Sequence, residues 1–167
     1  MSEVLVAFAT RNGSTQAVAE VVAATMTAAG KTVELRPARE VRGPLGQWDL
    51  VVLGAPIYSG RWHGVAHRFL KRHRKELGRV PVAVFGMGPR SGTEEGWKSS
   101  RRQLDRALAK RGWFAPAAVA LFGGVDPPKR RHERRDLRDW DAIRSWAAAL
   151  PSEGPAPASH VDEASPS

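Results

Sequence analysis

Cysteine is absent from the 167-residue sequence, which excludes a disulfide framework, thiolate metal ligands and a cysteine nucleophile. Long hydrophobic runs are absent too: none approaches the ~20 apolar residues of a membrane-spanning helix. The N-terminus, Met1-Ser2-Glu3, lacks the basic segment of a signal peptide. We therefore expect a protein that is not transmembrane and that is located in the cytoplasm.

The net charge of +9 is spread unevenly along the chain. Residues 1–60 hold equal numbers of bases and acids, and the excess lies in three later blocks. Residues 61–79 carry seven bases against one acid, residues 98–111 six against one, and residues 127–138 six against two. Such blocks favour an acidic partner or an anionic membrane surface, the latter by peripheral contact. A solvated, arginine-rich surface explains the same composition equally well.

Short apolar runs alternate with stretches of helical periodicity. Strands are expected at residues 4–9, 31–36, 49–55, 80–86 and 117–123. Helices are expected from Ser14 to a stop at Gly30, around 65–70, at 99–111 and at 139–150. This alternation predicts an α/β fold with a five-stranded parallel sheet, covered on both faces, in the order 2-1-3-4-5. Residues 1–150 form one domain, and residues 151–167, rich in Pro, Ala, Ser and acids, are expected to be a disordered tail.

The loop between the first strand and the first helix has the composition of an anion site. It consists of Thr10, Arg11, Asn12, Gly13, Ser14 and Thr15. The free N–H groups and the dipole of a helix N-terminus attract an anion, and the three hydroxyls can donate to it. An ordinary helix cap needs only one hydroxyl. The Gly-Lys-Ser/Thr of a P-loop and the G-x-G-x-x-G of a dinucleotide site are both absent, so a different phosphate loop is predicted.

Residues 6–22 resemble the flavodoxin signature, in which an aromatic, hydroxyl, small and apolar residues recur at fixed spacings. The positions in register are Phe8, Thr10, Gly13, Thr15, Ala19 and Val22, and the one departure is Ala7, where a larger apolar residue is usual. The resemblance implies a flavodoxin-like three-layer sandwich. It also implies that residues 10–15 hold the 5′-phosphate of FMN.

The loop after the third strand is expected to contact the flavin ring, since ligands of open α/β sheets lie at the carboxyl ends of the strands. Its candidate residues are Pro56, Ile57, Tyr58, Ser59, Gly60, Arg61 and Trp62. Tyr58 and Trp62 can stack on a flat ring, although Trp62 could instead pack against the following helix. The resemblance further suggests that the Ser59–Gly60 peptide rotates to offer its carbonyl to a protonated flavin N5.

The loop after the fourth strand supplies weaker candidates. The resemblance to flavodoxins implies that this loop closes over the other edge of the ring. The candidate ring contacts in it are Gly88 and Ser91. A plain glycine-rich turn explains the segment almost as well. Arg61 and Arg90 lie in the two ring loops, and nearby positive charge stabilises an anionic reduced flavin. We therefore predict a reduction potential less negative than that of an acidic flavodoxin.

Several features separate this basic chain from short flavodoxins, which are usually acidic. The Gly54-Ala55-x-Ile57 run leading to His63, the basic segment 69–75 and the segment 139–147 are similar to the flavodoxin-type, menaquinone-linked protoporphyrinogen oxidases of bacteria. That resemblance implies a quinone or porphyrinogen substrate, or a redox partner protein. Those oxidases carry a longer, partly apolar insertion after the fifth strand, whereas residues 127–135 here are short and polar.

The prediction is therefore an FMN-binding electron-transfer protein or small flavin oxidoreductase, with no catalytic side chain and no metal assigned. His63 and His67 are four residues apart, but no neighbouring carboxylate completes a metal site. One alternative is a non-redox basic binding module on the same scaffold. Nucleic-acid binding is not expected, because no known motif is present. A quinone or NAD(P)H-dependent reductase is another alternative, although no second nucleotide site is visible.

Overall fold

The sheet has the topology that the sequence predicts. The computed structural model describes residues 2–10, 13–58, 60–89, 92–125 and 136–151. Five parallel strands lie in the order β2-β1-β3-β5-β6. Their bounds are β1 Glu3–Phe8, β2 Thr32–Pro37, β3 Leu50–Tyr58, β5 Val82–Met87 and β6 Ala118–Phe122. Counted without the short β4, this is the predicted order 2-1-3-4-5.

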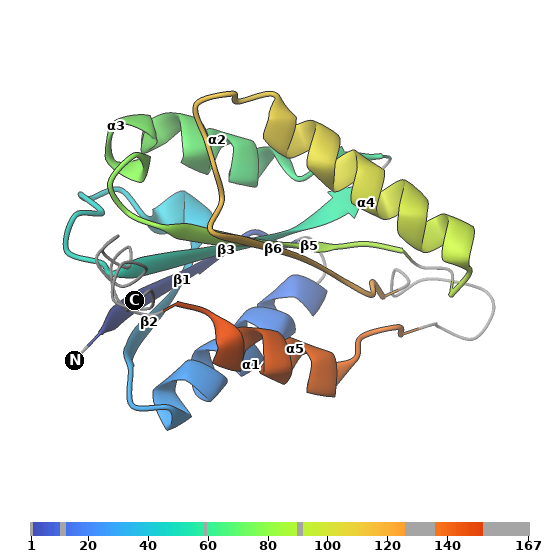
Figure 1. The fold of residues 1–167 in the computed structure, drawn as a ribbon, viewed down its shortest axis with the longest axis horizontal. Helices are drawn as coiled ribbons and strands as arrows, with labels where there is room; N and C mark the ends of the chain where they lie inside the picture. Colours follow the sequence, from blue (N-terminus) through green and yellow to red (C-terminus); the bar gives the residue numbers. More distant parts are fainter. Residues whose placement is uncertain (1, 11–12, 59, 90–91, 126–135, 152–167) are drawn as a thin grey trace, which may run out of the picture.

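The helices form one layer on each face of the sheet (Figure 1). One layer contains α1, Ser14–Ala28, and α5, Trp140–Ala149. The other contains α2, Gly64–Arg72, the short α3, Arg74–Leu77, and α4, Glu94–Ala109. A 3-10 turn, η1, Ala38–Glu40, follows β2 and packs against α2. The result is a three-layer α/β/α sandwich.

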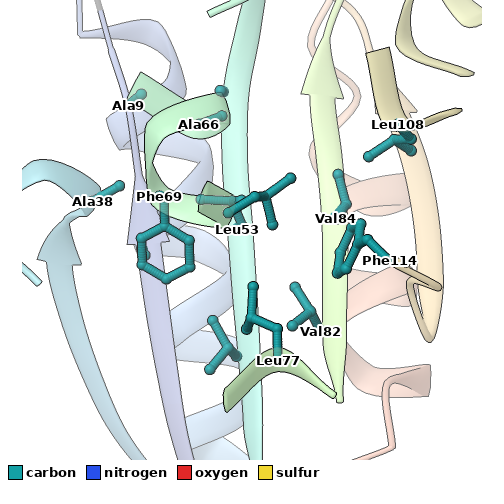
Figure 2. Packing of buried hydrophobic residues seen from close by; sticks show 14 of the residues in the cluster. Ala9, Ala38, Leu53, Ala66, Phe69, Leu77, Val82, Val84, Leu108 and Phe114 are labelled. Carbon is teal, nitrogen blue, oxygen red and sulfur yellow. The ribbon is translucent and has the colours of Figure 1, made fainter. Parts of the chain in front are cut away.

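Two apolar cores fill the spaces between the layers, which explains why the central strands are apolar along their whole length. On the α2–α4 side, Leu53, Phe69 and Val84 belong to a buried cluster that Figure 2 shows from close by. On the α1–α5 side, Phe85 and Ile143 belong to a second cluster. The edge strand β2 is only partly buried, in keeping with its alternating sequence.

Two local features differ from the sequence expectation. Helix α4 begins at Glu94 rather than near residue 99, because Thr93 caps it by accepting the Gly96 N–H at 3.1 Å. The first turn is charged and polar, so apolar periodicity could not reveal it. The second feature is β4, Arg61–Trp62, which turns back antiparallel on the end of β3. The segments 126–135 and 152–167, the latter being all of the predicted tail except Pro151, lie outside the described residues.

Candidate functional site

The site lies at the carboxyl ends of β1 and β3. These strands are neighbours in the sheet, and between them the order in which successive strands are added reverses. After β1 the chain enters α1 on one face of the sheet, and after β3 it enters α2 on the other face (Figure 1). The two connections therefore diverge and leave a crevice, which is where open α/β sheets bind ligands.

The loop after β1 is turned by Gly13. The Gly13 N–H donates to Thr10 Oγ1 at 2.8 Å, which closes the loop on itself. Gly13 has a φ of 84°, a left-handed conformation that favours glycine, and it leads directly into α1. A Cβ atom at Gly13 would meet nothing within 4 Å, so the left-handed backbone, not crowding, accounts for the glycine. Arg11 and Asn12 lie outside the described residues.

Thr15 is the most informative residue of this loop. Its side chain is fully buried, and its Oγ1 is the one buried side-chain polar atom of the described residues without a hydrogen-bond partner. An unsatisfied buried hydroxyl costs about 1–3 kcal/mol. Thr15 lies in the first turn of α1, where no acidic residue is present and where the helix dipole favours an anion. A phosphate at this position would satisfy the hydroxyl, so the residues present fit the phosphate of FMN.

The loop after β3 is a tight hairpin. Ile57 pairs with Trp62, and Tyr58 pairs with Arg61 across the β3–β4 turn. Gly60 has a φ of 75°, and Arg61 is exposed. Ser59 lies outside the described residues, so the proposed rotation of the Ser59–Gly60 peptide stays a prediction.

The two aromatic residues of this hairpin have different environments. Trp62 is only 2% exposed, its Nε1 donates to the Ala55 carbonyl at 3.1 Å, and its ring contacts the edge of His67. This is the packing arrangement that the sequence left open as the alternative to stacking. Tyr58 is half-buried and lines an open cleft, so it is the aromatic with a face available to a ring.

Of the weaker candidates after β5, only Gly88 is described. It is buried, and its N–H donates to the Phe122 carbonyl at 2.8 Å, so this N–H is already used within the sheet. A Cβ atom here would lie 2.7 Å from Leu121 and 2.9 Å from Ser100. Close packing therefore accounts for this glycine. Arg90 and Ser91 lie outside the described residues.

Sequence reasoning did not select Arg138, which lies beside the phosphate loop. Its guanidinium pairs with Asp136 at 2.6 Å and lies over the Trp140 ring, with 4.8 Å to the ring centroid. Its Nη1 is also 3.5 Å from the Ser14 carbonyl oxygen, 124 residues away in sequence. Nothing in the sequence pattern could identify a contact between such distant positions.

The two histidines that are four residues apart serve separate roles. His63 Nδ1 accepts the Val65 N–H and caps α2. His67 Nδ1 lies 2.9 Å from Arg111 Nη1. A guanidinium can only donate, so His67 Nδ1 accepts and the ring proton is on Nε2. Burial, followed by the charges of Arg111 and Lys110, lowers the pKa of His67.

A doubly wound parallel sheet with a hydroxyl-lined anion loop at its switch point defines a flavodoxin-type nucleotide-binding domain. The family model described as the flavodoxin domain matches residues 5–136, and the chain belongs to that family. FMN is the cofactor of flavodoxin domains.

Relatives and solved structures agree with this assignment. Protoporphyrinogen IX dehydrogenase [quinone] of Escherichia coli K12 is 30% identical over 124 residues, covering 72% of this chain and 67% of the relative. Oxidised flavodoxin 1 of Bacillus cereus aligns with a TM-score of 0.60 at 19% identity, covering 88% of this chain and 95% of the flavodoxin. A Fusobacterium nucleatum flavodoxin variant bound to flavin mononucleotide aligns with a TM-score of 0.53 at 13% identity, covering 89% and 92%. The structural likenesses show the fold.

Proposed function

We propose that this chain is an FMN-dependent oxidoreductase that oxidises a porphyrinogen-type substrate and passes the electrons to a quinone. The observation that carries the flavin part is the buried, unpartnered hydroxyl of Thr15 at the N-terminus of α1. The substrate part is supported by the name of the E. coli relative, protoporphyrinogen IX dehydrogenase [quinone]. Among the described residues, no helix is long and apolar enough to cross a membrane, so a quinone would be met at a surface.

The chain's own residues would bind and orient the cofactor. The loop formed by Thr10, Gly13 and Thr15 would hold the phosphate through N–H groups and the Thr15 hydroxyl. Tyr58 would stack on the ring. The buried Trp62 stabilises the hairpin through the hydrogen bond that its Nε1 donates to the Ala55 carbonyl. Bound FMN would supply the two-electron redox chemistry that links the substrate to the acceptor.

Arg61 is the residue that would tune this chemistry. It is exposed on the same hairpin as Tyr58, and no carboxylate among the described residues pairs with it. A cation beside the ring favours the negative charge that reduction adds. The expected result is a reduction potential less negative than in an acidic flavodoxin. This direction favours electron acceptance from the substrate.

The test begins with the absorption spectrum of the purified full chain before and after FMN is added. We expect saturable binding with quenched flavin fluorescence. The loaded protein is then mixed anaerobically with protoporphyrinogen and a soluble quinone, and formation of the coloured porphyrin is followed. Each turnover should remove two electrons and two protons from the substrate and convert one quinone to its quinol, so three turnovers and three quinones are needed for each porphyrin formed.

The outcomes separate the flavin proposal from the substrate proposal. FMN binding without porphyrin formation would leave an electron carrier for a redox partner protein, and the substrate proposal would be rejected. Absence of FMN binding would reject both. A non-redox binding module gives no reason for an unsatisfied hydroxyl in the α1 loop, which is why the redox role is preferred.

A further inference from the structure

Arg138 is a cation that its neighbours fix beside the first turn of α1. Its side chain is only 16% exposed, and the helix that follows it, α5, packs against α1 on the same face of the sheet (Figure 1). Asp136 accepts hydrogen bonds from the guanidinium Nε at 2.9 Å and from Nη2 at 2.6 Å, which is a bidentate pairing. The Trp140 ring lies against the face of the guanidinium. Contacts on one edge and on one face therefore determine where this charge lies.

The pairing with Asp136 also determines which nitrogen of Arg138 is directed toward α1. The carboxylate occupies the edge formed by Nε and Nη2, and the remaining nitrogen, Nη1, lies 3.5 Å from the Ser14 carbonyl oxygen. At this length the contact is weak as a hydrogen bond. It nevertheless places the positive group of the ion pair at the loop that the phosphate of FMN would occupy.

A cation is unfavourable at this end of α1 when no ligand is bound. The N-terminus of a helix carries a partial positive charge, which repels a guanidinium. The first turn of α1 contains no acidic residue that could offset this repulsion. The Asp136 carboxylate offsets part of it, but its side chain is 43% exposed and solvent screens its charge. An anion bound at the same turn would reverse the sign of the interaction, so a ligand explains the position of Arg138 better than the fold alone does.

The described residues of the phosphate loop supply no positive charge of their own. Thr10, Gly13, Ser14 and Thr15 are uncharged, and α1 contains no basic residue. Arg39 and Thr10 line a common pocket, but the side chain of Arg39 is exposed. Arg138 is therefore the better-positioned cation at this loop.

We propose that Arg138 is a specificity-determining residue of the phosphate site, which attracts the phosphate of FMN while Asp136 and Trp140 hold its guanidinium beside α1. A phosphate monoester carries about two negative charges at neutral pH. Riboflavin has the same ring and no phosphate, so Arg138 favours FMN over riboflavin. The inference rests on the proposed function, because it assigns a further residue to the same flavin site.

The test compares the Kd of FMN with that of riboflavin for the full chain, by quenching of flavin fluorescence at low ionic strength. R138Q should weaken FMN binding about tenfold and riboflavin binding less than about twofold, because only FMN carries the charge that Arg138 attracts. The matched control is R144Q. Arg144 is 55% exposed and pairs with Asp141 at 3.1 Å on α5, so its loss removes the same charge and should change both Kd values less than about twofold.

Two further variants separate an effect of charge from an effect of packing. D136N removes the carboxylate that opposes the phosphate and keeps Arg138, so FMN should bind about two- to threefold more tightly while riboflavin binding stays the same. If Asp136 and Arg138 only braced α1, the same variant would weaken FMN binding. D141N is the matched control and should leave FMN binding unchanged. R138K keeps the charge and should recover most of the preference for FMN that R138Q loses.

Three results would overturn the inference: equal weakening of FMN and riboflavin by R138Q, weaker FMN binding by D136N, or an effect of R144Q as large as that of R138Q. Urea unfolding of each variant shows that the folded protein is being compared. If the unaltered chain fails to bind FMN, the proposed function and this inference are both rejected. If it binds FMN tightly and R138Q leaves that Kd unchanged, this inference alone is rejected.

Discussion

Replacing Thr15 with valine should stabilise the FMN-free protein and weaken FMN binding at the same time. Thr15 Oγ1 is buried without a partner, so the substitution removes an unsatisfied polar atom and keeps the shape of the side chain. The removed desolvation cost corresponds to a gain of about 1–3 kcal/mol in the free energy of unfolding. In the loaded protein the same hydroxyl would donate to a charged phosphate. Losing such a bond costs about 1.5–3 kcal/mol, or roughly a 10- to 150-fold weaker Kd.

Thr25 supplies the matched control on the same helix. Its Oγ1 donates to the Val21 carbonyl at 2.8 Å, so its hydroxyl is already satisfied. Thr25→Val should therefore leave the FMN Kd unchanged and give no gain in stability. Urea unfolding of the FMN-free protein measures the stability change, and quenching of flavin fluorescence measures the Kd.

The two measurements on Thr15→Val have opposite expected signs, which makes the reasoning easy to refute. A variant that is less stable without FMN would mean that the hydroxyl has a partner in solution. A variant with unchanged FMN affinity would mean that the Thr15 hydroxyl does not contact the phosphate. Either result removes the main support for the phosphate site.

Three further predictions concern the hairpin and its neighbours. Tyr58→Ala should weaken FMN binding about tenfold, because ring stacking is lost, and should reduce the quenching of flavin fluorescence. Trp62→Phe should lower the free energy of unfolding by about 2–4 kcal/mol in urea, because it leaves a cavity and removes the bond to the Ala55 carbonyl, yet it should leave the FMN spectrum unchanged. The pKa of His67 is below its ordinary 6.5, so the unfolded chain binds more protons as the pH falls. The stability from this group is complete above pH 6.5 and is lost as the pH falls toward the folded-state pKa; His67→Gln should remove that part of the slope in urea unfolding at successive pH values.

The centre of the sheet could be predicted because β1, β3 and β5 are buried on both faces and therefore contain almost only apolar residues. The predicted strand over residues 49–55 overlaps β3, Leu50–Tyr58, and the order of the five parallel strands is confirmed. The start of α4 lies earlier than apolar periodicity predicts, because its first residues, Glu94-Glu95-Gly96, include no buried apolar side chain. Capping by the Thr93 hydroxyl, not hydrophobic periodicity, determines where that helix begins.

The candidate phosphate loop could be chosen from sequence because the relevant hydroxyls and glycine are consecutive. The sequence could not distinguish among those hydroxyls. Thr10 Oγ1 closes the loop by accepting the Gly13 N–H, whereas Thr15 Oγ1 is buried and unpartnered. Likewise, Tyr58 and Trp62 look equivalent in the sequence, and the antiparallel turn of β4 buries only the second. The direction in which each side chain points depends on this turn. The strand β4 has only two residues, which is too short for a hydrophobic periodicity to reveal it.

The charge of the chain is a further property whose arrangement the sequence could not predict. The block at residues 98–111 carries six bases and one acid, a composition that solvated surfaces and anion sites share. On the folded helix, Arg101 and Asp105 pair on one face, while Arg106 and Lys110 line the cleft without a carboxylate partner among the described residues. An exposed ion pair contributes little to stability. The main consequence of the pairing is that the positive potential of α4 is strongest around the bases that have no carboxylate partner in the part of the chain that the structure describes. Part of that potential lies beside the β3–β4 hairpin, where Arg61, Arg106 and Lys110 line the same cleft as Tyr58.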